Sequence, residues 1–118
     1  MNTHQHLFAA MAAALALCLT VPGVAAADVT EAQIAAAKTP ADHEAIAKAY
    51  DAEAATATAK AKSHEEMGRM YQVGGAPKAN APAMVGHCER LVKNYSAAAA
   101  EYRALAAEHR KFATEGAK

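Results

Sequence analysis

The fold is decided by residues 84–112, which read MVGHCERLVKNYSAAAAEYRALAAEHRKF. Apolar and aromatic side chains, with one histidine, recur here at alternating steps of four and three residues. This spacing places them on one side of an α-helix. The stripe consists of Met84, Cys88, Leu91, Tyr95, Ala98, Tyr102, Leu105, His109 and Phe112. The stretch therefore predicts one long helix with a continuous contact face.

A second stripe with the same spacing precedes the first. It consists of His43, Ala47, Tyr50, Ala54, Ala57, Ala61, His64, Gly68 and Tyr71. A Gly- and Pro-containing connector separates the two stripes, so the chain can turn back there. In an antiparallel pair folded at this connector, Gly68 faces Cys88 and His43 faces Phe112. Small residues then face large ones at most levels, as close packing of two helices requires.

These patterns predict an all-α fold, a long antiparallel two-helix hairpin with a coiled-coil-like, alanine-rich seam and a short N-terminal helix. The expected helices cover about residues 29–38, 40–72 and 82–115, with a connector at 73–81. Thr39 and Pro40 suit the start of the first long helix, and Asp28 or Thr30 can cap the short one.

A further row of residues at steps of seven lies beside the main stripe, where it could rest on the short helix or on a second hairpin. It consists of Val85, Val92, Ala99, Ala106 and Ala113. Alanine supplies little apolar area, so the seam predicts a thin core. A thin core invites self-association, and we expect a homodimer, with a four-helix bundle as one option.

Residues 1–27 have the pattern of a secretory signal peptide. Residues 7–21 are almost entirely apolar, a Pro-Gly pair follows, and small residues precede Asp28, so cleavage after Ala26 or Ala27 would suit. The segment ahead of the apolar run departs from the pattern because it holds no Lys or Arg. A membrane anchor fits less well, since Pro22 and Gly23 interrupt a run shorter than the ~20 residues that a spanning helix needs.

The expected mature chain is therefore a single helical-hairpin domain, residues 28–118, in the periplasm or secreted. Lipoprotein anchoring through Cys18 is disfavoured because the bulky Leu17 precedes it. No later run is apolar and long enough to cross a membrane, so we expect no integral membrane segment after signal removal.

The charges balance, with 12 Lys and Arg against 12 Asp and Glu. The absence of a basic face argues against nucleic acid as a partner. It also argues against a function as an amphipathic binder of membrane surfaces.

The sequence holds no CxxCH, no glycine-rich phosphate loop and no HExxH, since His64-Glu65 lacks the second histidine. We therefore expect no enzymatic activity.

Side chains with metal-binding chemistry gather at the connector end of the predicted hairpin. They are His64, Met67, Met84, His87 and Cys88. Thiolate, thioether and imidazole ligands together suit Cu(I). The alternative is ordinary packing, because methionine often fills gaps in a core. Neighbouring helix residues such as His87 and Cys88 also point about 100° apart.

Two smaller observations leave alternatives open. Cys88 is the single cysteine of the expected mature chain, which suggests a disulfide between two chains, a metal ligand or a buried thiol. His43 and His109 are near neighbours at the other end of the hairpin. They could bind a divalent ion weakly or simply cover the end of the seam with their rings.

The sequence thus favours an exported, small, non-enzymatic hairpin with an interaction or envelope-accessory role, acting as a homodimer and on an unidentified protein partner. No cofactor is expected for this reading. The alternative is a periplasmic soft-metal binding protein that binds copper.

Overall fold

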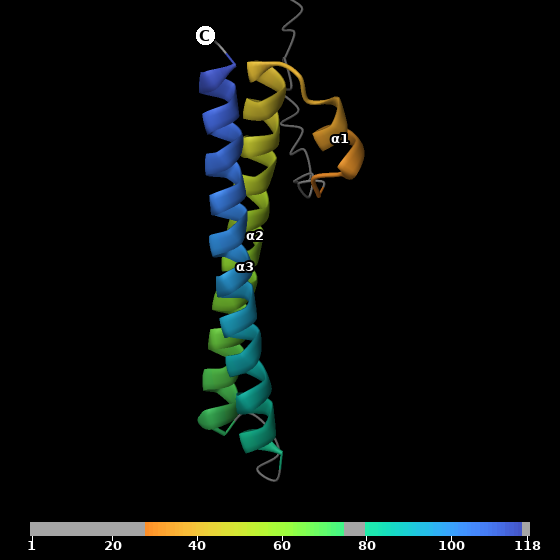
Figure 1. Cartoon of the computed structure of the whole chain (residues 1–118). Coiled ribbons are helices and arrows are strands. Elements are labelled where there is room, and N and C mark those ends of the chain that lie inside the picture. Colours follow the sequence, from red (N-terminus) through yellow and green to blue (C-terminus); the bar gives the residue numbers. More distant parts are fainter. Residues whose placement is uncertain (1–27, 75–79, 117–118) are drawn as a thin grey trace, which may run out of the picture.

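The computed structural model describes residues 28–74 and 80–116 of this chain. It contains three helices, α1 (Glu31–Ala36), α2 (Pro40–Gln72) and α3 (Ala81–Glu115), and the described residues contain no strand. The helices α2 and α3 lie antiparallel and side by side along their length, and α1 lies near the end where α3 finishes (Figure 1). The all-α hairpin with a short N-terminal helix is confirmed. The predicted signal peptide and most of the connector lie outside the described residues.

Each of the first two helices begins at a threonine whose side chain caps the helix N-terminus. The Thr39 hydroxyl accepts a hydrogen bond from the Asp42 amide at 3.2 Å, and the Asp42 carboxylate accepts one from the Thr39 amide at 2.9 Å. This reciprocal capping box satisfies two amides at the start of α2. Thr30 and Gln33 form the same box at α1, so Thr30 is the cap rather than Asp28. The backbone is already extended at Ala37, which makes α1 shorter than expected.

The turn at the end of α2 depends on a glycine. The Val73 amide donates to the Arg69 carbonyl, and Gly74 then adopts a φ of +99°, a conformation that residues with a Cβ rarely take. The helix α3 begins at Ala81, one residue earlier than predicted, with Pro82 in its first turn. At ~1.5 Å per residue, each long helix spans roughly 50 Å.

The predicted register of the hairpin is confirmed at both ends. Near the connector, a Cβ placed on Gly68 would lie 3.4 Å from the Cβ of Cys88. At the far end, the ring centroids of His43 and Phe112 are 5.3 Å apart. Because these contacts bracket most of the hairpin, the helices pair in the predicted alignment throughout.

The seam itself is made mostly of alanine. Its buried alanines are Ala47, Ala54, Ala57, Ala61, Ala99 and Ala106. The prediction was wrong about part of the α3 stripe, because Met84, Leu105 and Phe112 are 36%, 41% and 52% exposed. The heptad row, which could have rested on another element, supplies Ala99 and Ala106 to the seam, where Cys88 and His109 of the main stripe are also buried. Methyl side chains let the backbones approach closely, and the bulky neighbours then lie at the flanks.

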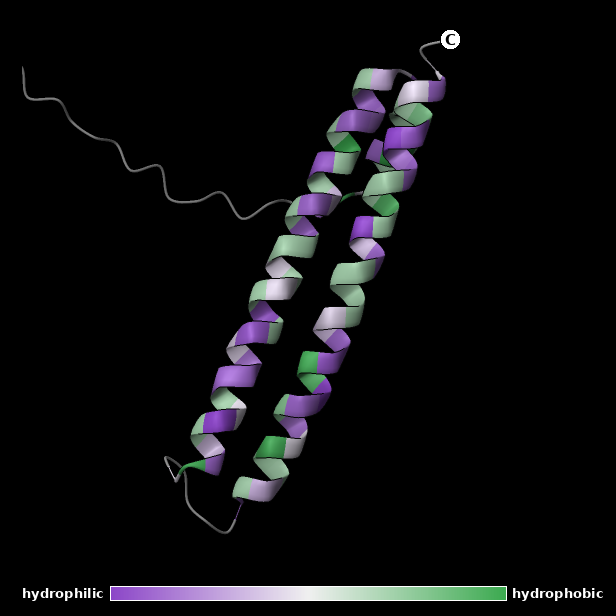
Figure 2. Cartoon of the chain, turned by 90° about the vertical axis from the view of Figure 1, so that its left-hand side faces the viewer, coloured by the Kyte–Doolittle hydropathy of each residue, from purple (hydrophilic) through white to green (hydrophobic). Residues whose placement is uncertain are grey.

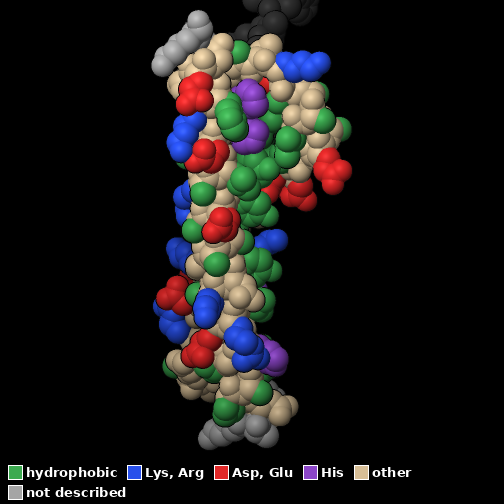
Figure 3. All heavy atoms as spheres, viewed as in Figure 1, with side chains coloured by type: hydrophobic (Ala, Val, Ile, Leu, Met, Phe, Trp, Pro, Cys, Tyr) green, Lys and Arg blue, Asp and Glu red, His purple; other side chains and the backbone are tan. Residues whose placement is uncertain are grey.

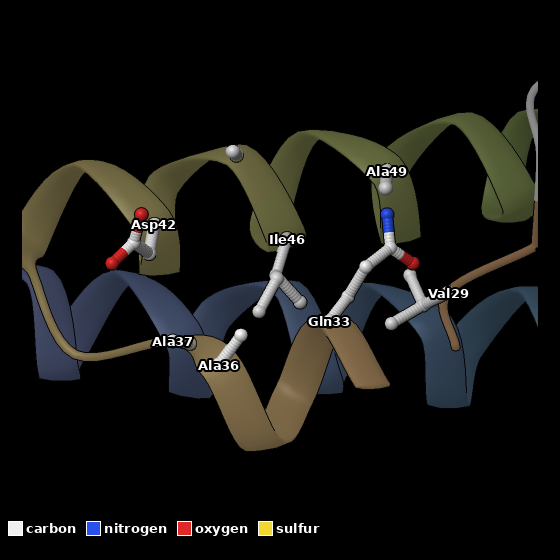
Figure 4. Close-up of a pocket in the computed structure, with 8 residues that line it drawn as sticks. Val29, Gln33, Ala36, Ala37, Asp42, Ile46 and Ala49 are labelled. Atoms are coloured by element: carbon white, nitrogen blue, oxygen red, sulfur yellow. The ribbon is translucent and has the colours of Figure 1, made fainter. Parts of the chain in front are cut away.

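The short helix α1 covers the apolar end of α2. Ile46 is 6% exposed and points from α2 toward the segment that holds Val29 and Ala36 (Figure 4). The Val29 amide donates to the buried carboxylate of Glu53 at 2.8 Å. The same carboxylate raises the pKa of Tyr102 above its ordinary value. Glu53 therefore attaches the N-terminal segment to the hairpin.

Hydrophobic and polar residues are mixed along both long helices (Figure 2). Among the described residues, no helix combines the length and the apolar character needed to cross a membrane.

We expect the seam to reject a larger side chain at Ala106, which has no exposed surface. The substitution Ala106→Leu should lower the free energy of unfolding by about 1–3 kcal/mol, because the extra atoms force α2 and α3 apart. Urea unfolding followed by circular dichroism measures this change. The matched control is Ala104→Leu at an exposed position of the same helix. Equal unfolding midpoints for the two variants would contradict the packing described here.

Candidate functional site

The connector end brings together two of the five predicted metal ligands. His64 and Cys88 line one groove between α2 and α3, together with Gly68, Val85 and Val92. This groove has a volume of about 310 Å³. Cys88 is buried at 5% exposure, and its thiol is free. Its burial agrees with the buried-thiol alternative, while the disulfide and metal-ligand alternatives stay predictions.

His64 is unusual because part of its ring has no polar partner. The ring stacks on Tyr95, with centroids 5.7 Å apart and planes 9° from parallel. Its Nδ1 atom is buried and makes no hydrogen bond, the one such side-chain atom found among residues 28–74 and 80–116. A buried nitrogen without a partner costs free energy. A ligand in the adjoining groove would offset that cost.

The other three predicted ligands do not line this groove. His87 is exposed, and its Nδ1 atom lies 2.8 Å from a guanidinium nitrogen of Arg90. Met84 is partly exposed and Met67 is half-buried. In the described part of the chain, no group of three or more His, Cys, Asp or Glu side chains is arranged to hold a metal ion. Within the predicted set, the geometry therefore favours His64 and Cys88 as the two residues that lie together. Metal binding by any of the five residues stays a prediction.

A second polar feature lies at the open end of the hairpin, where α2 begins and α3 ends. The Nδ1 atoms of His43 and His109 are 3.0 Å apart, a hydrogen-bonding distance. One ring must donate and the other accept, so the pair needs one protonated and one bare Nδ1. The sequence identified these two residues as neighbours. It could not reveal the direct contact, which depends on the rotamers of both side chains.

Aromatic rings enclose this histidine pair. The ring of His109 lies 5.7 Å from that of Tyr50 and 6.1 Å from that of Phe112, measured between centroids. His109 is only 9% exposed, whereas His43 is half-buried. Burial, assisted by the neighbouring His43, lowers the pKa of His109 below its ordinary value. The buried surroundings of His109 therefore favour the neutral form of its ring.

The two long edges of the hairpin differ in character. Arg110 forms ion pairs from α3 to Asp51 and Glu44 on α2, and Arg103 donates to the Thr58 hydroxyl at 2.9 Å. Such exposed pairs contribute little stability individually. Along the other edge, Tyr95, Ala98 and Tyr102 line a groove with Ala57 and Glu53. Figure 3 shows hydrophobic side chains continuing along this edge below α1.

Comparison with known proteins finds no family model, no curated protein and no solved structure that matches this chain. The function is therefore argued from its own residues.

The histidine pair predicts a stability that falls in mild acid. The pKa of His109 is lower in the folded chain than its ordinary value of about 6.5, so the unfolded chain binds the proton more readily. The resulting stability is present above pH ~6.5 and is lost as the pH falls through the folded pKa. Urea unfolding at pH 7 and pH 5, with a chelator present, should show a lower midpoint at pH 5.

The variant His109→Gln tests the source of this loss, because its amide gains no proton at pH 5. It should show a smaller drop between the two pH values than the original chain. His87→Gln, at an exposed position, should keep the full drop. A drop of the same size in all three proteins would show that His109 is not responsible.

Proposed function

We propose that this protein is an exported, non-enzymatic helical hairpin that acts by binding another protein chain, beginning with a second copy of itself. The observation that carries this proposal is a row of two leucines and two tyrosines, with one alanine between them, which the alanine seam leaves at one flank of α3. We call this row the apolar flank. It consists of Leu91, Tyr95, Ala98, Tyr102 and Leu105. The steps of four and three between its members place them on one side of α3.

The energetics of the hairpin support a partner on this flank. Alanine methyl groups bury little apolar area, and at ~25 cal/mol per Å² a seam of such residues stabilises a two-helix hairpin weakly. Leu105 keeps 41% of its surface exposed, and the tyrosines beside it are only half-buried. A second chain would remove this remaining apolar surface from water.

The distribution of charge favours a second copy as that chain. The ion pairs of Arg110 and the hydrogen bond of Arg103 lie along the other long edge, where they bridge α2 and α3. The apolar flank instead presents tyrosine and leucine side chains, which can pack on the same residues of an identical chain. Its charged neighbours are Lys60, over the Tyr95 ring, and Asp28 and Glu53 in the groove beside Tyr102. A twofold axis along the flank would place the apolar flank of one chain against the apolar flank of the other and form one closed dimer. Four long helices would then surround a larger apolar core.

The place of action follows from the segment ahead of the hairpin. The composition of residues 1–27 supports export, with Asp28 near the start of the mature chain. In the periplasm or outside the cell, a small hairpin of this kind suits an envelope-accessory role in which the dimer, or one copy of it, binds a further protein.

A charge placed on the apolar flank should separate the two copies. We expect Leu105→Lys to weaken the dimer at least tenfold, because the ammonium would have to leave water in the interface. Analytical ultracentrifugation over a concentration series measures the dissociation constant. Ala104→Lys adds the same charge at the neighbouring exposed position and should leave the dimer intact. A chain that is monomeric at all concentrations, or a dimer that tolerates Leu105→Lys, would contradict self-association through this flank.

A second candidate function is the binding of Cu(I), favoured by His64, whose buried Nδ1 has no partner and which lines the same groove as Cys88. Imidazole and thiolate are suitable ligands for this ion. The remaining predicted ligands lie at the same connector end of the hairpin and would complete the coordination after a change of rotamer. They are Met67, Met84 and His87.

This candidate predicts one Cu(I) per chain in native mass spectrometry under reducing conditions. The variants Cys88→Ser and His64→Gln should lose the ion, because each removes a ligand from the groove. Lys62→Gln, an exposed change on α2, is the control and should keep it. Copper bound equally well by Cys88→Ser, or not bound by the original chain, would exclude this function.

A further inference from the structure

The histidine pair at the open end joins two segments far apart in the sequence. His43 belongs to the second turn of α2, and His109 lies near the end of α3, 66 positions later. Their rings are held in place by packing, since His43 and His109 each lie within about 6 Å of the Phe112 ring centroid. Two imidazole nitrogens are therefore fixed close together on a rigid part of the fold.

The spacing of these nitrogens matches the spacing of two ligands on one metal ion. Bonds of about 2.0–2.1 Å join zinc to imidazole nitrogen, and at ligand angles of roughly 90–110° two such nitrogens lie about 2.9–3.4 Å apart. The observed separation of 3.0 Å falls within this range. To bind one ion, both rings must turn so that their Nδ1 lone pairs point at the ion rather than at each other.

We propose that His43 and His109 form a metal site that binds a borderline divalent cation, Zn²⁺ or Cu²⁺, through both Nδ1 atoms. Imidazole is a preferred ligand of these ions. It binds them in its neutral form. This site is separate from the connector end and does not depend on the functions proposed above.

Binding requires a change of tautomer but no net loss of protons at neutral pH. In the hydrogen-bonded pair, one ring carries its proton on Nδ1. When the cation binds both Nδ1 atoms, that proton leaves to solvent while Nε2 of the same ring takes one up. Each ring therefore keeps one proton.

Water completes the coordination in this proposal. Within the described segments, no third His, Cys, Asp or Glu joins the pair to make a group that could hold a metal. The nearby Asp42 carboxylate already accepts hydrogen bonds from the amides of Lys38 and Thr39. Histidine side chains gather on the surface over α2 and α3 near α1, where solvent can reach them (Figure 3). Two protein ligands and an open face describe a site that exchanges its ion readily.

A cation bound by both histidines would link α2 to α3. The connector already joins α2 to α3 at one end of the hairpin, whereas the histidine pair lies at the other. An ion held by both helices opposes their separation at the open end. Because it binds the folded hairpin and not the unfolded chain, it raises the stability of the fold.

Zinc titration of the chain carrying His64→Gln, His87→Gln and Cys88→Ser tests the proposal without interference from the connector end. The probe is Zn²⁺ alone at pH 7, followed by ¹⁵N NMR of the imidazole rings. We expect the Nδ1 resonances of His43 and His109 to shift together to saturation at one ion per chain. The thermal midpoint should rise in parallel.

Two single variants in the same background separate ligand loss from a folding defect. His43→Gln changes a half-buried residue, and His109→Gln changes its buried partner. Each should weaken zinc binding at least tenfold and remove the zinc-dependent rise in the thermal midpoint. Circular dichroism checks that the helices remain. All of these proteins share the same N-terminal segment, so zinc bound there would survive both changes.

Three results would overturn the proposal. The two Nδ1 resonances could stay unchanged in millimolar zinc, only one of the two rings could respond, or a folded His43→Gln variant could bind zinc as tightly as its parent.

Discussion

Ala47 and Ala106 have no exposed surface, and their contact region sets how closely α2 and α3 can approach. Methyl side chains allow two helix backbones to come near, which leaves no room for a leucine or a phenylalanine between them. Leu105 and Phe112 therefore lie at the flank with about half of their surface in water. The close approach thus has two consequences. The core contains little apolar area, and large apolar side chains remain partly exposed on the surface.

The sequence was sufficient for the helices and their register, because both depend on local or repeated signals. Thr39 with Asp42 begins α2, Gly74 ends it, and the four-three spacing aligns Gly68 with Cys88. It was insufficient for the rotation of α3. The main stripe and the heptad row through Ala99 are neighbours on one helix, and spacing does not distinguish them. The close approach of the backbones selects the small residues Ala99 and Ala106 from the heptad row, whereas Cys88 and His109 are buried from the main stripe.

The same seam explains where the chemistry lies. A narrow, alanine-lined interface leaves space beside it for flat rings, and both partly buried histidine sites occupy such space. His64 stacks on Tyr95, and His109 lies among Tyr50, His43 and Phe112. The sequence located these residues on the seam. Whether each ring nitrogen would find a partner depends on side-chain rotamers, and so the unpartnered Nδ1 of His64 and the contact between His43 and His109 required the structure.

A seam this thin makes the stability of the hairpin responsive to whatever binds it. The net stability of a small domain is a small difference between large terms, and a ligand that binds only the folded state adds its binding free energy to that difference. His109 and Leu105 are one turn apart on α3, the first buried against α2 and the second 41% exposed at the flank. Because Ala47 and Ala106 contribute little apolar area, each buried ring in this region forms a larger share of the core than it would in a seam of bulky residues. A change at His109, such as protonation of its ring, therefore bears directly on the packing of α2 against α3.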